Sequence, residues 1–152
     1  MNTPFPMLWF ESRAAEAAEF YTSLLPNSEI AHTEYYPEDV PGGEPGSVLT
    51  VDFSLNGARF TALNGGPHDV FNDSVSFVIP CEHQDEIDRL WDALTADGGQ
   101  ESKCGWLKDK FGLSWQIVPE NIAELLSTQA ATQAMLQMKK LDIAALEAAG
   151  AA

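Results

Sequence analysis

Gln116 is the residue whose type and position most call for a chemical explanation. It lies in a short segment, residues 113–118, in which apolar and mixed positions alternate as in a half-buried strand. Gly112 precedes the segment and supplies the backbone freedom of a tight turn. A glutamine in such a strand can be a metal ligand, a hydrogen-bonding group for a bound molecule, a remnant of lost chemistry, or a buried amide satisfied by its neighbours.

The other side chains that commonly perform chemistry do not form a recognisable set. Cys81 and Cys104 are too few for a disulfide framework and lack the C-x-x-C spacing of a metal site, so we interpret them as small buried thiols. His32, His68 and His83 fall in or beside a predicted strand, a linker and a predicted helix, and we expect them at the surface. Only His68 is placed to reach the mouth of a pocket. Spacing pairs no nucleophile with a base.

The charge of the chain argues against several classes of partner. Its 152 residues include 23 acidic and 8 basic side chains, for a formal net charge of −15. Such a surface repels phosphate backbones and anionic membranes, so we expect neither nucleic acid nor membrane as a partner. No apolar run approaches the roughly 20 residues of a membrane helix, and the first residues show no signal-peptide pattern. We therefore expect a cytoplasmic protein with reduced thiols.

The elements that must position Gln116 form two similar series. The first series reads as a strand at 5–11, a helix capped by Ser12 and stopped at Pro26, and strands at 29–36, 48–55 and 58–64, the last two joined by an Asn56-Gly57 hairpin. A Pro- and Gly-rich loop covers 37–46, and a linker covers 65–73.

The second series repeats this order after the linker. It reads as a strand at 74–80, a helix with Ile87, Leu90, Trp91 and Leu94 on one stripe, short strands near 99–102 and 103–109, and the strand of Gln116. Gly98 suits the end of the helix. Because both halves read strand, helix and about three strands, the sequence predicts an α+β fold of two β-α-β-β-β modules.

The residues after Pro119 are predicted to form a helical arm. Met135 and Met138 fall on one helical stripe, Asp142 is a good N-cap, and Leu141 can form a hydrophobic staple with Leu146. This arm carries enough apolar surface to pack on the body or on a second chain, and we expect a homodimer.

Four stretches of the sequence together resemble a known family. LWFESRAAEAAEFYTSLLPNSEI, LNGGP, CGWLKDKFGLSWQIVP and AMLQMKKLDIAALEAA are similar, in order and spacing, to the PhnB-like (demethylubiquinone methyltransferase-like) branch of the vicinal-oxygen-chelate superfamily. The resemblance implies the glyoxalase/bleomycin-resistance fold, with curved mixed sheets that form cup-like cavities. It also implies one domain over 1–152, with modules at about 5–64 and 74–119, a linker at 65–73 and an arm at 120–149.

The methyltransferase label of that branch finds no support in the residues. A methyltransferase of the common kind holds its methyl donor with a glycine-rich loop between a strand and a helix. The glycines of this chain fall in turns and linkers, and LNGGP leads into a linker.

The resemblance also indicates where a divalent metal would be bound. The four ligand positions fall at about Pro6, at Thr61, Ala62 or Asn64, at Ser74 or Ser76, and at Gln116. One amide and a few hydroxyls would hold zinc or nickel poorly, because these cations want several anionic or imidazole ligands. We therefore expect no cofactor and an apolar pocket with neutral polar groups, formed by Leu8, Phe10, Asn64, Ser74, Ser76, Trp106 and Gln116.

Four functions remain open at this point. The leading hypothesis is a metal-independent protein, or a cryptic enzyme, that binds a small, partly apolar and neutral or cationic molecule. The second is a metal-dependent enzyme of glyoxalase or dioxygenase type that uses Gln116 with groups such as His68 or Glu11. The third is a methyltransferase, and the fourth is a structural dimer whose side chains fill the cups.

Overall fold

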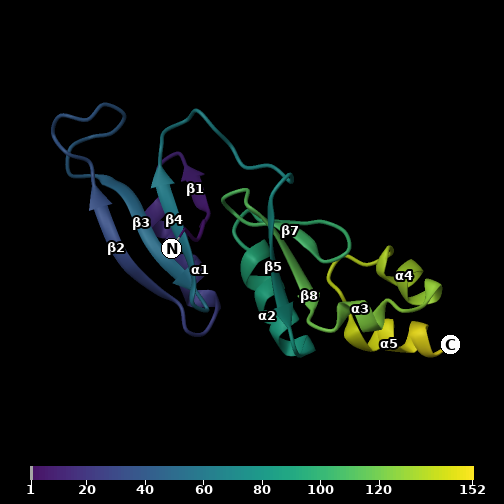
Figure 1. Ribbon diagram of the computed structural model, residues 1–152. Coiled ribbons are helices and arrows are strands. Elements are labelled where there is room, and N and C mark those ends of the chain that lie inside the picture. The colour runs from purple at the N-terminus through teal and green to yellow at the C-terminus, as the bar shows by residue number, and fades with distance from the viewer. Residues whose placement is uncertain (1) are drawn as a thin grey trace. The chain divides into compact units, whose positions relative to one another are not determined.

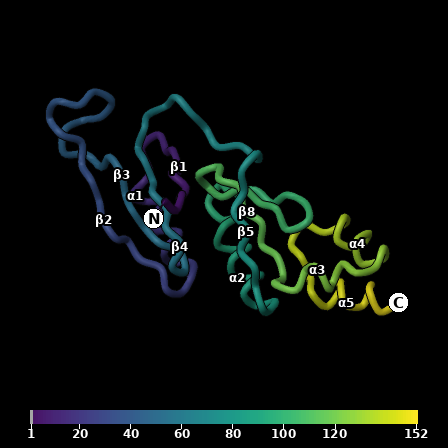
Figure 2. Tube along the Cα trace, in the orientation of Figure 1, coloured from purple at the N-terminus to yellow at the C-terminus, as the bar shows by residue number. Residues whose placement is uncertain are grey.

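The computed structural model describes residues 2–152, and the chain divides into two compact units, Met1–Val70 and Phe71–Ala152 (Figure 1). Each unit contains one four-stranded sheet and its own helices. Figure 2 follows the chain from the first unit through the linker into the second. The assignment of both units to a single domain stays a prediction.

The first unit follows the predicted order of elements. It comprises β1 (Met7–Phe10), α1 (Ala14–Leu24), β2 (Glu29–Tyr35), β3 (Val48–Leu55) and β4 (Ala58–Asn64). The strand order is β1-β4-β3-β2, with β1 parallel to β4 and the other pairs antiparallel. The predicted hairpin is confirmed, because Leu55 pairs with Ala58 and both Asn56 and Gly57 have positive φ, 47° and 85°.

The start of α1 differs from the prediction that Ser12 caps it. Arg13 is the N-cap residue, and no side chain at that position caps the helix. Instead Asn64, at the end of β4, accepts a hydrogen bond from the backbone N–H of Ala14 at 2.8 Å. A residue distant in sequence thus satisfies an amide that the first turn leaves unpaired.

The second unit repeats this topology. It comprises β5 (Ser76–Cys81), α2 (Gln84–Thr95), β6 (Gln100–Glu101), β7 (Trp106–Lys108) and β8 (Ser114–Pro119), in the strand order β5-β8-β7-β6. β5 is parallel to β8, as β1 is to β4. The predicted stripe of α2 is confirmed, since its four apolar side chains are all at most 2% exposed. The α+β fold of two β-α-β-β-β modules is therefore confirmed.

The arm consists of three short helices that belong to the second unit. They are α3 (Ile122–Leu125), α4 (Gln129–Met135) and α5 (Ile143–Ala151). Asp142 caps α5 as predicted, by accepting a hydrogen bond from the N–H of Ala145 at 3.0 Å. The shared helical stripe of Met135 and Met138 is wrong, because α4 ends before Met138.

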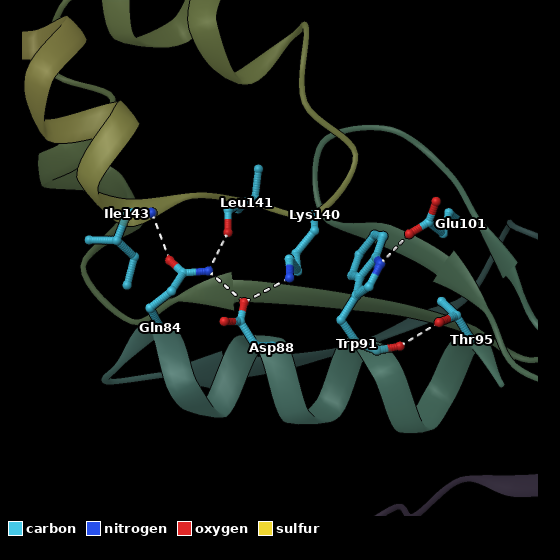
Figure 3. Close-up of polar contacts among 8 residues, drawn as sticks. All are labelled: Gln84, Asp88, Trp91, Thr95, Glu101, Lys140, Leu141 and Ile143. Atoms are coloured by element: carbon cyan, nitrogen blue, oxygen red, sulfur yellow. Dashed lines mark hydrogen bonds and ion pairs between the residues drawn. The ribbon is translucent and has the colours of Figure 1, made fainter.

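The side chain of Gln84 fastens the arm to α2. Its Nε2 donates to the carbonyl of Leu141 and its Oε1 accepts from the N–H of Ile143, both at 2.9 Å (Figure 3). Lys140 adds an ion pair with Asp88 at 2.9 Å. Leu141 and Leu146 are fully buried, so these two of the arm's apolar residues are core residues, whereas Met135 and Met138 are half-buried.

None of the helices in residues 2–152 is both long enough and apolar enough to cross a membrane.

Candidate functional site

The open face of the second sheet carries the Gln116 amide. Gln116 lies beside Val78 on the parallel neighbour β5, and its Nε2 donates to Oγ of Ser76 at 3.0 Å. Both polar side chains are half-buried. The opposite face carries Trp115 and Ile117, which are 2% and 0% exposed, and α2 contacts β8. The alternation predicted for residues 113–118, with one buried face, is thus confirmed.

Trp106 continues this open face on β7. It is the Cα partner of Gln116 across the antiparallel β7–β8 pair, so the two side chains leave the same face. Beside Trp106 lies a hollow of about 410 Å³. Its lining residues are Asp73, Gln100, Glu101, Ser102, Trp106, Leu107 and Lys108.

A buried carboxylate fixes the turn that leads into β8. Asp109 is 2% exposed, and its Oδ1 accepts from the N–H groups of Phe111 and Leu113 at 2.8 and 3.1 Å. Its Oδ2 accepts from the indole of Trp115 at 2.8 Å. These bonds hold the strand that presents Gln116. Sequence reasoning identified the turn but missed this carboxylate, although an Asp at a turn before a Gly is a recognisable signal.

Leu8 and Phe10 are not on the open face of the first sheet. They are 6% and 5% exposed, and Leu8 is in register with the buried Ala62, on the side that α1 covers. Both residues are core residues, and their inclusion in the pocket is corrected accordingly. The open face instead carries Met7 and Trp9, which sequence reasoning missed.

Asn64 and Ser74 also have local structural partners. The Asn64 amide accepts from Ala14 and donates to the carbonyl of Val48 at 3.1 Å, so it joins α1 to the sheet. It lines a hollow of about 370 Å³ beside the start of α1. Ser74 lies before β5, is exposed, and bonds to the side chain of Asn72. Of the predicted pocket residues, the structure brings together Ser76, Trp106 and Gln116.

The predicted metal positions of the first unit offer no ligand set. The carbonyl of Pro6 accepts from the N–H of Thr61 at 3.0 Å, and the Thr61 hydroxyl donates to Asp52 at 2.5 Å. The side chain of Ala62 has no atom that could coordinate a metal ion. Residues 2–152 contain no group of three or more His, Cys, Asp or Glu side chains that could hold a metal ion. The neutral donors at the aligned positions therefore do not fit zinc or nickel.

The histidines and Cys81 have the predicted exposures, and Cys104 is less buried than predicted. The three histidines are exposed. Cys81 is buried and Cys104 is half-buried, and both are free thiols. Burial raises the pKa of Cys81 to about 11, Glu86 adds to this effect, and Arg89 opposes it. Cys81 is thus a protonated core thiol at neutral pH, without the lowered pKa of a nucleophile.

The comparisons with known proteins agree with this architecture. Residues 2–118 match the family model described as 3-demethylubiquinone-9 3-methyltransferase. A PhnB protein from Bacillus cereus is 34% identical, with a TM-score of 0.69, and the match covers 77% of this chain and 99% of that one. No curated protein matches this chain.

Two more distant structures share the fold. Protein PA1353 from Pseudomonas aeruginosa is 18% identical, with a TM-score of 0.63 over 78% of this chain and 98% of that one. The fosfomycin resistance protein FosX from Listeria monocytogenes is 13% identical, with a TM-score of 0.56 over 84% and 98%.

The extent of the family match separates the modules from the arm. The matched residues end at 118, one residue before the end of β8, so α3, α4 and α5 lie outside the family model. The expected resemblance extended to AMLQMKKLDIAALEAA in the arm, which the family model does not reach. The matched part holds both β-α-β-β-β modules, and the chain belongs to the PhnB-like family whose model is described as 3-demethylubiquinone-9 3-methyltransferase.

Proposed function

We propose that this chain is a metal-independent small-molecule-binding protein, or a cryptic enzyme, that takes a small, partly apolar ligand on the open face of its second sheet. The observation that carries this proposal is the neutral pair of Ser76 and Gln116, hydrogen-bonded at 3.0 Å on that face. A metal site would need anionic or imidazole donors at these positions.

The pair leaves hydrogen-bonding capacity for a ligand. Because the Ser76 oxygen accepts the bond from Gln116, the Ser76 hydroxyl hydrogen can donate to a ligand. The amide of Gln116 retains a second N–H and its carbonyl oxygen for the same purpose. The acidic chain favours a neutral or cationic ligand over an anion.

The metal-dependent alternative comes from distant relatives. A mutant of FosX is described as a complex with Mn(II) and 1S,2S-dihydroxypropylphosphonic acid. Its 13% identity to this chain supports a shared fold and carries no ligand set across.

The methyltransferase name of the family receives no support from the strand-to-helix connections. Residues 11–13 join β1 to α1, residues 82–83 join β5 to α2, and neither connection contains a glycine. A loop of the dinucleotide or methyl-donor type needs glycines at this point.

A substitution and a metal analysis test the proposal together. Gln116→Leu is expected to weaken the binding of small neutral fragments about tenfold, because it removes the amide and leaves an apolar side chain of similar size. Gln129→Leu, on the exposed side of α4, is the matched control and leaves binding unchanged. Stoichiometric zinc or nickel in untagged wild-type protein, abolished by Gln116→Leu, would overturn the metal-free interpretation.

We also propose a cytoplasmic homodimer without nucleic acid or membrane partners. The two free thiols support a reducing compartment, and the net charge of −15 disfavours anionic partners. Exposed apolar side chains on edge strands, Met7 on β1 and Val78 on β5, support association. Light scattering at micromolar concentration is expected to return twice the monomer mass of 16.6 kDa, and a monomer mass would contradict the dimer.

A further inference from the structure

Three residues form a charged row on the open face of the first sheet. β2, β3 and β4 lie side by side (Figure 1), with Glu29 in register with Ser54 and Ser54 in register with Arg59. Residues in register on neighbouring strands leave the same face of the sheet. The row therefore has a carboxylate at one end, a hydroxyl in the middle and a guanidinium at the other end.

The Arg59 guanidinium is held in place by two contacts. It lies over the ring of Phe5, at 3.6 Å from the ring centre, and its Nη2 lies 3.9 Å from Oδ1 of Asp52. The second distance is too long for a hydrogen bond, and that oxygen accepts from the hydroxyl of Thr61 instead. Phe5 and Asp52 thus orient the guanidinium, while its N–H groups remain open to solvent and can bind an anionic group as a fork.

Glu29 stands apart from Arg59 on the same face. Two strand spacings separate the two residues, which is about 10 Å. No ion pair joins them, and the Glu29 side chain makes no hydrogen bond within residues 2–152. Both side chains are exposed. Two opposite charges therefore face solvent at the two ends of the row without neutralising each other.

A hollow lies along this row. Its volume is about 500 Å³, and its lining includes all three residues of the row and Asp52. Ser54, in the middle, is half-buried. The volume is within the range of small-molecule sites.

The charges of the lining set the class of ligand. A simple cation would be attracted by Glu29 and Asp52 but repelled by Arg59. A simple anion would meet two carboxylates and a chain with a net charge of −15. A molecule with one anionic and one cationic end matches both ends of the row. Its charges must be several atoms apart, because the row is longer than the single carbon that separates the charges of an α-amino acid.

We propose that this hollow binds a small zwitterion, with its carboxylate on Arg59 and its ammonium group on Glu29. The site lies within the first unit. The inference goes beyond the proposed function, which concerns the second sheet, and neither depends on the other.

Three probes of equal chain length test the proposal. They are δ-aminovalerate, which carries both charges, valerate, which lacks the ammonium group, and pentylammonium, which lacks the carboxylate. Each is titrated into ¹⁵N-labelled full-length protein, and the backbone N–H signal of Ser54 and the Nε–H signal of Arg59 are followed. δ-Aminovalerate is expected to move both signals in a saturable way at millimolar concentration, and to bind about tenfold more tightly than either other probe. Equal or tighter binding of valerate or pentylammonium, or no response to δ-aminovalerate, overturns the proposal.

Two substitutions decide whether the row itself recognises the probe. Glu29→Gln is expected to remove the advantage of δ-aminovalerate over valerate, and Arg59→Gln its advantage over pentylammonium. The indole N–H signals of the four tryptophans, assigned with Trp→Phe variants, report whether each variant is folded. An advantage that survives the corresponding substitution in a folded variant overturns the proposal.

Glu38→Gln is the matched control for Glu29→Gln. It removes the same charge from an exposed residue in the loop between β2 and β3, outside the hollow. It is expected to leave the affinities of all three probes unchanged. An effect equal to that of Glu29→Gln would show that the total charge of the chain, and not the row, selects the probe, and would overturn the proposal.

Discussion

Two polar side chains in the second unit, Asp109 and Gln116, differ in how many of their polar atoms form hydrogen bonds within the protein. The Asp109 carboxylate accepts three hydrogen bonds from its own turn and from Trp115, and it has almost no contact with solvent. Gln116 bonds to Ser76 on a half-exposed face. A fully engaged group stabilises the fold, whereas a partly engaged one can also bind a ligand.

Trp115 is the residue at which this structural role can be measured. Trp115→Ala is expected to cost about 3–5 kcal/mol in the free energy of unfolding, because it empties a core site beneath α2 and removes the partner of Asp109. Trp115→Phe, which fills most of the space but loses the N–H, should cost less. Urea denaturation measures both. A cost below that of Trp106→Ala, at a half-buried position, would contradict the core assignment.

Cys81 makes stability depend on alkaline pH. Burial raises the pKa of the folded thiol to about 11, above its ordinary value of 9.0. The unfolded chain therefore loses the thiol proton first, so stability is complete below about pH 9 and falls as the pH rises toward 11. The loss is about 1–3 kcal/mol. Unfolding curves from about pH 8 to about 11 should show this extra loss in wild type and in Cys104→Ser but not in Cys81→Ala.

At the scale of elements, alternation in the sequence predicts most strands. It does not show which face of a strand is buried when the residues on both faces are apolar. In β3 the apolar Val51 and Phe53 alternate with polar neighbours, so the buried face is readable from the sequence. In β1 all four residues are apolar, and nothing in the strand indicates that Leu8 and Phe10 face the helix. Their burial follows from the register with β4, which sequence reasoning did not use.

Hydrogen bonds between side chains and distant elements also could not be predicted from the sequence. Asn64 was assigned to the pocket as a polar residue at a strand end, but it caps a helix 50 positions earlier. Gln84 was assigned no role, and it fastens the arm through two bonds to the 141–143 segment. Both amides need a partner that only the three-dimensional arrangement brings near.

Gln84 allows the attachment of the arm to be tested at a single side chain. Gln84→Ala removes both bonds to the arm and is expected to cost about 1–3 kcal/mol. Gln84→Glu keeps an acceptor for the N–H of Ile143. It also places a carboxylate oxygen against the carbonyl of Leu141 and Oδ1 of Asp88, to which Nε2 donates at 2.9 and 3.0 Å, so repulsion should make it cost more than Gln84→Ala at neutral pH. Hydrogen exchange of the Ile143 amide measures the local effect. An unchanged exchange rate in Gln84→Ala would show that other contacts hold the arm.

At the scale of the whole chain, the two units share a topology and the same bond after the last strand, but they differ in the segment that follows it. The N–H of Gly65 bonds to Phe10 after β4, and the N–H of Glu120 bonds to Cys81 after β8, at 2.9 and 2.8 Å. The first unit then continues into the linker, whereas the second continues into the arm. The internal repeat was visible in the sequence because whole elements recur, and the docking of the arm was not.

Removal of the arm should therefore affect the two units unequally. A chain ending at Glu120 loses the carbonyls that accept from Cys104 and Gly105, and it also loses the Leu141 side chain that lies close to Gly105. We expect the second unit to lose stability and the Trp106 indole signal to shift, because the start of β7 is no longer fixed. The Trp9 signal, in the first unit, should stay in place.

Lys140→Ala is the control for this truncation, because it removes only an ion pair between partly exposed side chains. Its cost is expected to be about 0–1 kcal/mol, with no shift at Trp106. In the truncated chain, loss of the Trp9 signal together with that of Trp106 would show that the arm supports both units. An unchanged Trp106 signal would show that β7 is positioned by the sheet alone, through its pairing with β8, and that the hollow beside Trp106 forms without the arm.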